Sequence, residues 1–492
     1  MAEIRSPTDG QSGIEPSGVD QSGIESSAGQ PGGHVFAPTI EATWGKESRA
    51  LLFLGAPMAL TQIVQFSINA IDVLMIGRLG PEEIAASSLG LLFFFTAFIV
   101  GYGPAMAVSP MISQAIGAGT REANNDASSE VRRSVRMGLW SLLALWPAVI
   151  VLFAFAPSIA TALGQPEELS VMAGPYVLAL APSWLFAEGI LVLRNFLAAI
   201  ERTRFPLLVI IGTTFLNAFL NWLLIFGALG APELGLLGAG IASSIANGVG
   251  FAVLAWYCMS DQRAKPYAVL SKFNAPDWPR LQEVGRLGWP IAVTTAFEGF
   301  LFNACILVMG RIGVDEMAAY QVALNVAAMA FMGAFGFAMA GSVRVGLHQG
   351  AGDRAGVRIA SALSIVYATA VITCFAVPVF LFPEFISELY LDRSDPGNAA
   401  VLVIIVSFLR IAALFMLFDA VQVAANQALR GVKDVTAPMI ITGVSYWVVG
   451  FPIAVFLGLF SPVGAPGVWI GFLISLGLAA VLLGARLYWK TR

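Results

Sequence analysis

Charged residues, histidine and cysteine are all scarce in this sequence. Only 12% of the 492 residues are charged, whereas 57% are hydrophobic and the mean hydropathy is +0.78. A soluble domain could not carry this composition without aggregating, so the sequence predicts a polytopic membrane protein. The two histidines, His34 and His348, lie far apart in the chain, so we expect no metal cluster built from histidine and cysteine.

The three cysteines are scattered as well. Cys258, Cys305 and Cys374 each lie singly within an apolar run. Small, apolar packing residues have this distribution, so we expect neither a disulfide nor a metal-binding role for them. The net charge of −4 is spread over the loops, and it indicates no nucleic-acid partner.

Residues 1–46 differ in kind from the rest of the chain. They are rich in Gly, Ser, Pro and Gln, and they repeat the string Gln-Ser-Gly-Ile-Glu at 11–15 and 21–25. Such a composition cannot bury enough apolar surface to form a core. We therefore expect a disordered tail, which the orientation derived below places on the cytoplasmic side.

Twelve apolar stretches follow this tail, each near or above the ~20 residues that a spanning helix needs. They lie at 50–76, 88–114, 135–156, 171–193, 206–226, 238–260, 284–310, 319–346, 359–382, 398–429, 438–458 and 465–488. The sequence therefore predicts an all-α membrane protein with twelve transmembrane helices. Three of the stretches are long enough to tilt or kink.

The distribution of Lys and Arg predicts the orientation of these helices. If both termini lie in the cytoplasm, the outer loops contain only Arg78, Arg311 and Arg393, and Arg410 falls within a span. All the other basic residues then lie on the cytoplasmic side, as the positive-inside rule requires. We therefore expect a multi-pass protein with both termini in the cytoplasm.

The chain also contains an internal repeat. The string VLMIGRLGPEEIAAS at 73–87 matches ILVMGRIGVDEMAAY at 306–320, an offset of 233 residues. The same offset pairs the Gly-Ala-Gly strings at 117–119 and 350–352. Each half has six spans, an even number, so both halves insert in the same direction and are related by a pseudo-twofold axis along the membrane normal.

This repeat predicts the domain organisation. We expect an N-terminal six-helix lobe at 47–260, a charged cytoplasmic linker at 261–283 and a C-terminal six-helix lobe at 284–492. Parallel repeats of this kind usually enclose a central cavity and expose it alternately to each side of the membrane.

Four carboxylates lie within the predicted spans: Asp72, Glu188, Glu298 and Asp419. A charged carboxylate at the bilayer centre costs about 2.5–3.5 kcal/mol on insertion scales, so such residues mark functional sites by default. Binding of a proton or of a hard cation such as Na⁺ would neutralise them. The alternative is a structural acid paired with an arginine, and for Asp419 the candidate is Arg410, nine residues earlier in the same span.

Two asparagines share one helix face. Asn217 and Asn221 are spaced i and i+4 in the fifth predicted span, so both side chains point the same way. A hydrogen bond to a neighbouring helix and a direct contact with a ligand are both consistent with this spacing.

Four longer strings are characteristic: GAPMALTQIVQFSINAIDVLMIGRLG (55–80), GAPELGLLGAGIASSIAN (230–247), SVRVGLHQGAGD (342–353) and FDAVQVAANQALRGVKDVTAPM (418–439). They resemble the multidrug and toxic compound extrusion (MATE) family, most closely its bacterial NorM branch. The similarity covers roughly residues 45–490. It implies two six-helix lobes in a bacterial inner membrane, which export cationic, amphipathic compounds in exchange for Na⁺ or H⁺.

The resemblance also implies roles for individual residues. Asp72 matches the acid of the first helix, Glu298 the glutamate of the cation site in the seventh, and Asp419 the aspartate of the tenth. All three acids would then couple transport to a proton or a cation, and Glu298 and Asp419 would be the candidate Na⁺ ligands. Asn217 and Asn221 match the asparagines of the fifth helix as cavity or supporting residues. Glu188 matches no family position, and it stays a candidate supporting residue.

The expected function is therefore a secondary antiporter that exports drugs and toxic compounds by alternating access. A lipid-linked precursor flippase of the wider superfamily is the alternative, which basic residues lining the central cavity would favour. Away from the ends of the predicted spans, the only basic residue is Arg410. An enzyme is not expected, because histidine is nearly absent and no large loop could carry a catalytic site. We expect no cofactor besides the coupling ion, small-molecule substrates and membrane lipids as partners, and a monomer.

Overall fold

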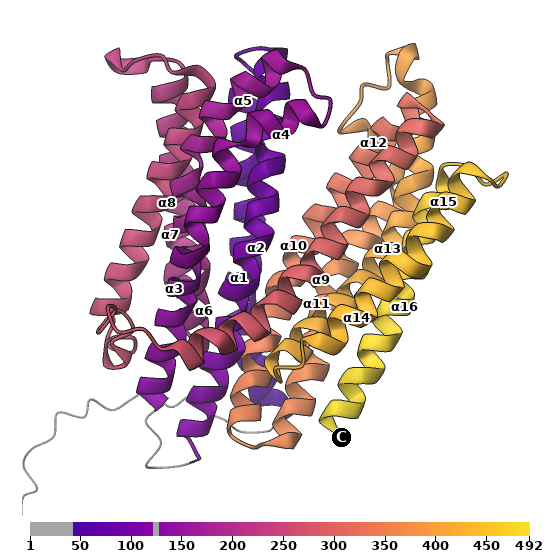
Figure 1. Ribbon diagram of the computed structural model, residues 1–492. Coiled ribbons are helices and arrows are strands. Elements are labelled where there is room, and N and C mark those ends of the chain that lie inside the picture. Colours follow the sequence, from indigo (N-terminus) through magenta and orange to yellow (C-terminus); the bar gives the residue numbers. More distant parts are fainter. Residues whose placement is uncertain (1–42, 122–126) are drawn as a thin grey trace, which may run out of the picture. The chain divides into compact units, whose positions relative to one another are not determined.

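The computed structural model describes residues 43–121 and 127–492, and within them it contains helices and no β-strand (Figure 1). Positions 1–42 of the predicted tail at 1–46 therefore lie outside the described residues. The first helix begins at Trp44, six residues before the apolar stretch that predicted it. The all-α prediction is confirmed.

Eleven of the described helices are long and apolar enough to cross a membrane. They are α1 (Trp44–Ile76), α2 (Pro81–Gly119), α3 (Ala127–Ala154), α7 (Arg204–Ile225), α8 (Gly235–Ser260), α9 (Trp278–Ile312), α10 (Val314–Gly350), α11 (Arg354–Leu381), α13 (Ala399–Gly431), the run from α14 (Thr436–Gly443) to α15 (Phe451–Leu459), and α16 (Pro466–Thr491). Each of them overlaps one of the predicted spans.

The twelfth span is a bent pair of helices, α5 (Glu167–Ala179) and α6 (Ala181–Ala199), whose axes meet at 45°. Pro182 in the first turn of α6 explains the break, because proline has no N–H to donate and its ring clashes with the preceding turn. The Trp146 indole N–H donates to the Ala181 carbonyl oxygen, beside the break, at 3.0 Å. Twelve spans are therefore present when this pair is taken as one.

Two short helices that the sequence did not predict lie between the spans. They are α4 (Ala156–Ala162) and α12 (Pro383–Glu388), and each has a proline in its first turn. A π-helical segment, η4 (Val444–Gly450), joins α14 to α15. It ends just before Pro452, so the change of helical pitch falls where a backbone donor is missing.

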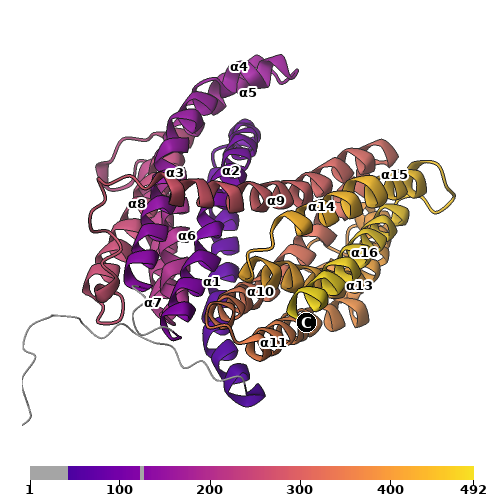
Figure 2. The ribbon, with the colours of Figure 1, turned by 60° about the horizontal axis from the view of Figure 1, so that its bottom comes forward.

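The buried apolar side chains form two large clusters. One is built mostly by helices α1 to α8, between Leu51 and Ile291, and the other by helices α9 to α16, between Leu301 and Ala479. Figures 1 and 2 show the same division, with α3, α7 and α8 on one side, α13 and α16 on the other, and α2 and α10 between them. The two repeats therefore correspond to two packed groups of helices.

The second helices of the two halves cross at glycines. A Cβ added to Gly117 of α2 would overlap the carbonyl oxygen of Leu347 on α10, and one added to Gly350 of α10 would overlap the carbonyl oxygen of Gln114 on α2. Small residues let helix backbones approach closely in membranes, where packing drives association. The repeated Gly-Ala-Gly strings therefore mark the crossing near the pseudo-twofold axis.

A second pair of contacts obeys the same symmetry. Gly336 of α10 packs against the backbone of Ala59 on α1, and Gly103 of α2 packs against Ala292 on α9. Each residue of the first contact is related to one of the second by the 233-residue offset. The two halves are thus held together by close helix crossings that the repeat duplicates.

We predict that Gly336→Ala destabilises the protein by about 1–3 kcal/mol, because the added methyl group would overlap Ala59 and force α1 and α10 apart. Gly212→Ala in α7 is the matched control, since nothing lies within 4 Å of the added Cβ. Thermal unfolding of the purified variants measures the difference. A Gly336→Ala protein as stable as the Gly212→Ala protein would contradict this account of the crossing.

Candidate functional site

A cavity of about 520 Å³ lies between the two groups of helices, lined by residues from both halves of the chain. Most of its walls are apolar or aromatic: Phe95, Phe98, Tyr102, Ile190, Leu191, Phe302, Leu324, Phe331, Met332, Phe335, Met339 and Phe415. Its polar groups are few and come mainly from α1, α6, α9 and α13. Mostly apolar walls with a few convergent polar groups are typical of sites for small organic ligands.

Two of the predicted acids line this cavity. Glu298 is contributed by α9 and Asp419 by α13, and their charges act on each other. Asp419 is only 4% exposed, and its Oδ1 has no hydrogen-bond partner within the described residues. The same is true of Oε1 of Gln422, one turn further along α13. These unsatisfied acceptors fit a proton or a hard cation, because buried polar atoms are otherwise paired.

Asp419 does not form the ion pair with Arg410 that was the alternative to a functional role. Arg410 is more than half exposed, and its Nη2 lies 3.1 Å from Glu384 Oε1 instead. The interpretation of Asp419 as an acid paired with Arg410 is therefore wrong.

Arginines other than Arg410 line the cavity, which corrects the expectation that the spans offer it only that one basic residue. Arg194 of α6 donates to Gln65 Oε1 at 2.8 Å and to Gln62 Oε1 at 2.9 Å. Arg430 of α13 acts electrostatically on Glu298. Both arginines immediately follow the predicted ends of their spans, at 193 and 429, so a boundary error of one residue hid them. Helical spacing was the usable signal, since 419, 423, 426 and 430 share one face of α13.

The predicted site residues Asp72, Asn217 and Asn221 of the N-terminal half lie outside this cavity. The Asn221 side-chain amide donates to Asp72 Oδ1 at 2.6 Å and to Asn217 Oδ1 at 3.2 Å, and the Asn217 amide donates to Ser243 Oγ at 3.2 Å. This chain of hydrogen bonds connects α1, α7 and α8. Neither asparagine nor Asp72 lines the 520 Å³ cavity. The asparagines therefore make interhelical hydrogen bonds, and they bring Asp72 into the same polar cluster.

Glu188 of α6 lies apart from both groups. It is fully buried, and neither carboxylate oxygen has a hydrogen-bond partner within the described residues. A Cβ on Gly101 would approach the Glu188 carboxyl carbon to 3.0 Å, so the carboxyl packs directly against α2. The following residue, Tyr102, lines the cavity. Glu188 is thus one side chain removed from the cavity wall.

Sequence reasoning missed Tyr446, which lies on the π-helical segment η4. Its hydroxyl is buried without a partner among the described residues, and the charges of Glu298 and Asp419 both act on it. The neighbouring Trp447 indole N–H donates to the Phe297 carbonyl oxygen at 3.2 Å, which ties η4 to α9 beside Glu298. π-helical turns often occur at functional sites. The only signal for this site in the sequence was Pro452, which predicts a distortion of the helix but not which side chains it turns toward the cavity.

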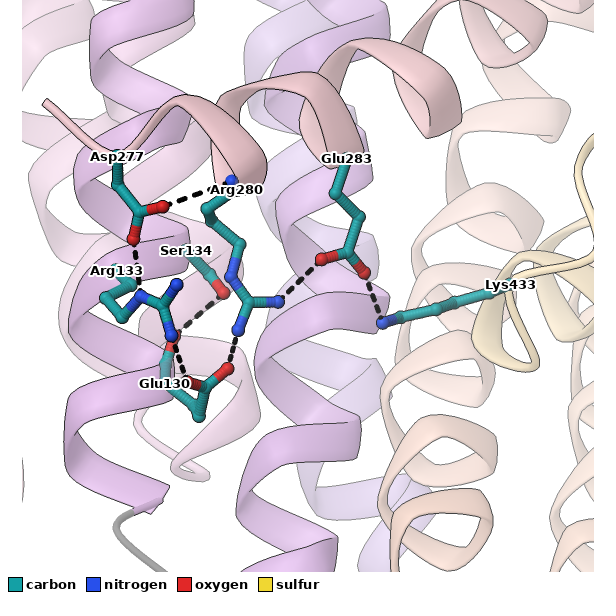
Figure 3. Close-up of polar contacts among 7 residues, drawn as sticks. All are labelled: Glu130, Arg133, Ser134, Asp277, Arg280, Glu283 and Lys433. Atoms are coloured by element: carbon teal, nitrogen blue, oxygen red, sulfur yellow. Dashed lines mark hydrogen bonds and ion pairs between the residues drawn. The ribbon is translucent and has the colours of Figure 1, made fainter.

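An ion-pair network connects α3 of the first half to α9 of the second, at the end of the helices that the charge pattern assigns to the cytoplasm (Figure 3). Its members are Glu130 and Arg133 of α3, Asp277 and Arg280 at the start of α9, Glu283 further along α9, and Lys433 after α13. Arg280 contacts Glu130 across the two halves, and its Nη1 lies 2.7 Å from Glu283 Oε2. Lys433 Nζ lies 2.8 Å from Glu283 Oε1 and extends the network.

Asp277 has two roles in this network. As the N-cap of α9, its Oδ1 accepts a hydrogen bond from the Arg280 backbone N–H at 3.2 Å. Its Oδ2 pairs with the Arg133 guanidinium, which holds the pKa of this carboxyl below its usual range. The start of α9 is therefore fastened to α3 by side chains that stay charged at neutral pH.

A buried ion pair connects the halves a second time at this end. Glu47 of α1 accepts from Arg344 of α10 through both oxygens, with distances of 2.7 Å to Nε and 2.6 Å to Nη2. His348 Nε2 lies 2.9 Å from the same carboxylate, and Arg344 Nη1 lies 3.1 Å from Glu201 Oε1. Such a bidentate, fully hydrogen-bonded pair is the geometry that makes a buried charge tolerable.

The family profile of MatE matches residues 57–223 and 290–456. The chain belongs to the MatE family. The two matches are displaced by 233 residues, the offset of the internal repeat, so each half of the chain is one MatE unit.

Curated relatives place this MatE chain in the NorM-like bacterial branch. A probable multidrug resistance protein NorM of Mesorhizobium japonicum is 38% identical over 447 residues, which cover 91% of this chain and 94% of the relative. Another, of Rhizobium meliloti, is 40% identical over 454 residues, with coverage of 91% and 94%. The family resemblance predicted from the sequence is therefore confirmed.

Solved MATE structures share the fold. The eukaryotic MATE transporter AtDTX14 superimposes with a TM-score of 0.78 at 22% identity, covering 92% of this chain and 99% of the other. A MATE structure in complex with MaL6 gives a TM-score of 0.82 at 19% identity, with the same coverage. At this identity the likeness concerns the fold alone, and it confirms the predicted two-lobed, twelve-helix architecture.

We predict that Asn221→Ala lowers the stability of the protein by about 1–3 kcal/mol, because it leaves the Asp72 carboxylate without the amide that satisfies it. Asn303→Ala is the control, since this exposed amide bonds within the described residues only to the Gly299 carbonyl oxygen of its own helix. The denaturation midpoints of the two purified variants measure this difference in stability. Equal midpoints for the two variants would show that the Asp72 hydrogen bond contributes nothing to stability.

Proposed function

We propose that the protein is a secondary active antiporter of the inner membrane that exports cationic or amphipathic compounds in exchange for Na⁺ or H⁺. The observation that carries the proposal is the pair of acids, Glu298 and Asp419, in a mostly apolar cavity between the two halves. The relatives in the NorM branch, which are named multidrug resistance proteins, support drugs as the substrate class. On this proposal the chain is a transporter and not an enzyme.

Coupling follows from competition for the cavity's negative charge. Two carboxylates that act on each other in a mostly apolar cavity favour the uptake of a positive charge, either a proton or Na⁺. A bound cation lowers the attraction of the site for a cationic substrate. Each charge that moves through the membrane potential provides about 2.3 kcal/mol per 100 mV, which can drive substrate outward.

The acids of the first half would have a supporting role in this cycle. Asp72 is held by Asn221, and Asn217 orients that amide in turn, so the cluster can bind a proton or stabilise one state of its lobe. Glu188 packs behind the cavity wall at Gly101. Neither acid shares the cavity with Glu298, so we assign the coupling ion first to Glu298 and Asp419.

Alternating access would move the lobes about the glycine crossings. The lobes are proposed to span 47–260 and 284–492, joined by the linker 261–283, with both termini in the cytoplasm. The ion pairs in Figure 3 would then hold the cytoplasmic ends together while the cavity faces outward. A single chain provides the whole cavity lining, so we propose that a monomer is sufficient for transport.

A lipid-linked precursor flippase is the second candidate, and Arg194 and Arg430 favour it because cations in the cavity would attract a diphosphate group. One observation weighs against it, since Arg194 is already engaged by Gln62 and Gln65. Arg430 remains open to an anion, because its Nη1 has no hydrogen-bond partner within the described residues. The flippase therefore stays the second candidate, and transport of a cation is the first because two carboxylates line the same cavity.

The test is efflux of ethidium from proteoliposomes under a sodium gradient and, separately, a proton gradient. For the wild type we expect efflux that follows one gradient. Glu298→Gln should lose about 100-fold or more of the coupled rate, as expected for loss of a positioned proton- or charge-binding group. Glu233→Gln, a change at an exposed acid in an outer loop, is the matched control and should transport normally.

Three results would count against the proposal. Transport of ethidium without any gradient dependence would exclude antiport. Normal coupled transport by Glu298→Gln would make this acid structural. Absence of ethidium transport by folded, inserted wild type, together with translocation of a lipid-linked diphosphate, would favour the flippase.

We predict that Glu130→Gln shifts the protein toward the state in which the cytoplasmic ends separate, because it removes the contact between Glu130 and Arg280. A partly exposed pair is worth about 0.5–1 kcal/mol, so the ratio of states should change about two- to fivefold. Distances between spin labels at the cytoplasmic ends of α3 and α9 report the shift. Glu168→Gln, at an exposed acid in α5, is the control; identical distance distributions for both variants would argue against a gating role.

A further inference from the structure

A second cavity, of about 780 Å³, opens at the end of the helices that carries the ion pairs. Its walls are the first turns of α1, the segment 201–208 that leads from α6 into α7, Tyr257 of α8 and Arg344 of α10. It shares no lining residue with the cavity of Glu298 and Asp419. The transport function proposed above does not account for it.

The charge of this cavity is strongly positive. Its lining contains five cationic side chains, Lys46, Arg49, Arg202, Arg204 and Arg344, against two carboxylates, Glu47 and Glu201. Both carboxylates are occupied by a single arginine of the set, Arg344. The remaining positive charge therefore exceeds what the lining itself can neutralise.

Two of the arginines are available to a ligand. Arg49 and Arg204 are exposed, and within the described residues no ion pair joins either of them to a carboxylate. Arg49 lies over the Phe53 ring at 5.6 Å, a contact that leaves its N–H groups free to bind. Arg202 differs from them, because its Nη2 lies 3.2 Å from Asp261 Oδ2.

The start of α7 adds backbone donors to the same cavity. Thr203 is the N-cap of this 22-residue helix, and its side chain makes no capping hydrogen bond. The first N–H groups of a helix have no intrahelical partner, and the helix dipole places partial positive charge there. Arg204 and Phe205, which carry the first two of these N–H groups, line the cavity together with Thr203, whereas the third helical residue, Pro206, has no N–H. Backbone N–H groups and guanidinium groups together form a site for a phosphate group.

The rim of the cavity is apolar. Phe53 and Leu208 line it and are 56% and 63% exposed, and Phe205 stacks on Tyr257 with 3.8 Å between ring centres. Trp44 at the start of α1 and Trp256 near the end of α8 are also exposed, as tryptophans at a membrane–water interface are. The cationic floor therefore lies at the depth of lipid headgroups, with apolar side chains on its outer edge.

We propose that this cavity binds the headgroup of an anionic phospholipid, with the phosphate held by Arg49, Arg204 and the start of α7 and the acyl chains lying on Phe53 and Leu208. A free phosphate has the same charge chemistry but would leave the apolar rim without a function. Basic pockets between helices at the cytoplasmic face suit anionic lipids, which that leaflet contains. The bound lipid would link α1 to α7 beside the Glu47–Arg344 pair.

The test uses the full-length protein purified in a neutral detergent. Its melting temperature is followed as short-chain phosphatidylglycerol, phosphatidylcholine or inorganic phosphate is added. Phosphatidylglycerol should give a saturable rise, and the other two should not. Arg49→Gln with Arg204→Gln should weaken the apparent affinity about 30-fold, since each basic group near an anionic lipid surface contributes about a factor of five.

The matched control removes two exposed arginines from the opposite ends of the helices, Arg78→Gln with Arg311→Gln, and should leave the response unchanged. If the first double variant is not monodisperse, Arg204→Gln alone should weaken binding about fivefold. An unchanged response in the pocket variants would overturn the proposal. So would an equal response to phosphatidylcholine, or an equal and pocket-dependent response to inorganic phosphate, which would identify a free-anion site.

Discussion

The close crossing of α2 and α10 is the constraint on which the rest of this structure depends. Gly117 and Gly350 bring the two backbones together so closely that neither position has room for a side chain. In a membrane, where lipid is as apolar as leucine, such packing replaces the hydrophobic effect as the force between helices. The crossing fixes the distance between the lobes, and that distance determines whether Glu298 of α9 and the aromatic side chains of α2 can line one cavity.

The repeat makes the two lobes similar in backbone and different in charge. The 233-residue offset places Gln65 opposite Glu298 and Cys305 opposite Asp72, so the first predicted span of each half contains one acid, but at a different level. The two levels are seven residues apart, which is about 10 Å along a helix. Glu298 therefore faces the shared cavity, whereas Asp72 is enclosed within its own lobe by Asn221. A symmetric frame thus holds two acidic sites in different surroundings.

Hydropathy and the repeat were enough to predict the twelve spans and the two-lobed architecture, because the length of an apolar run and its period are local properties. They could not predict which side of a helix faces the cavity. The apolar parts of α2 and α10 have no polar face that would distinguish the side toward lipid from the sides toward the lobe core and the cavity. Arg194 and Arg430 were overlooked for another reason, because each follows the predicted end of its span by one residue. Arg410, the partner in the alternative interpretation of Asp419, was chosen only for its proximity along the helix, and it pairs with Glu384 instead. Tertiary packing decides these orientations.

The two connections between the halves at the end assigned to the cytoplasm differ in strength, and this difference suggests how the lobes would move. Breaking the buried Glu47–Arg344 pair would leave an uncompensated charge, at about 3–5 kcal/mol. The pairs that join α3 to the start of α9, Arg133–Asp277 and Arg280–Glu130, are partly exposed and cost about 1 kcal/mol or less each. One charge crossing the membrane potential provides enough to break the second set but not the first. We therefore expect α1 and α10 to stay in contact while α3 and α9 separate.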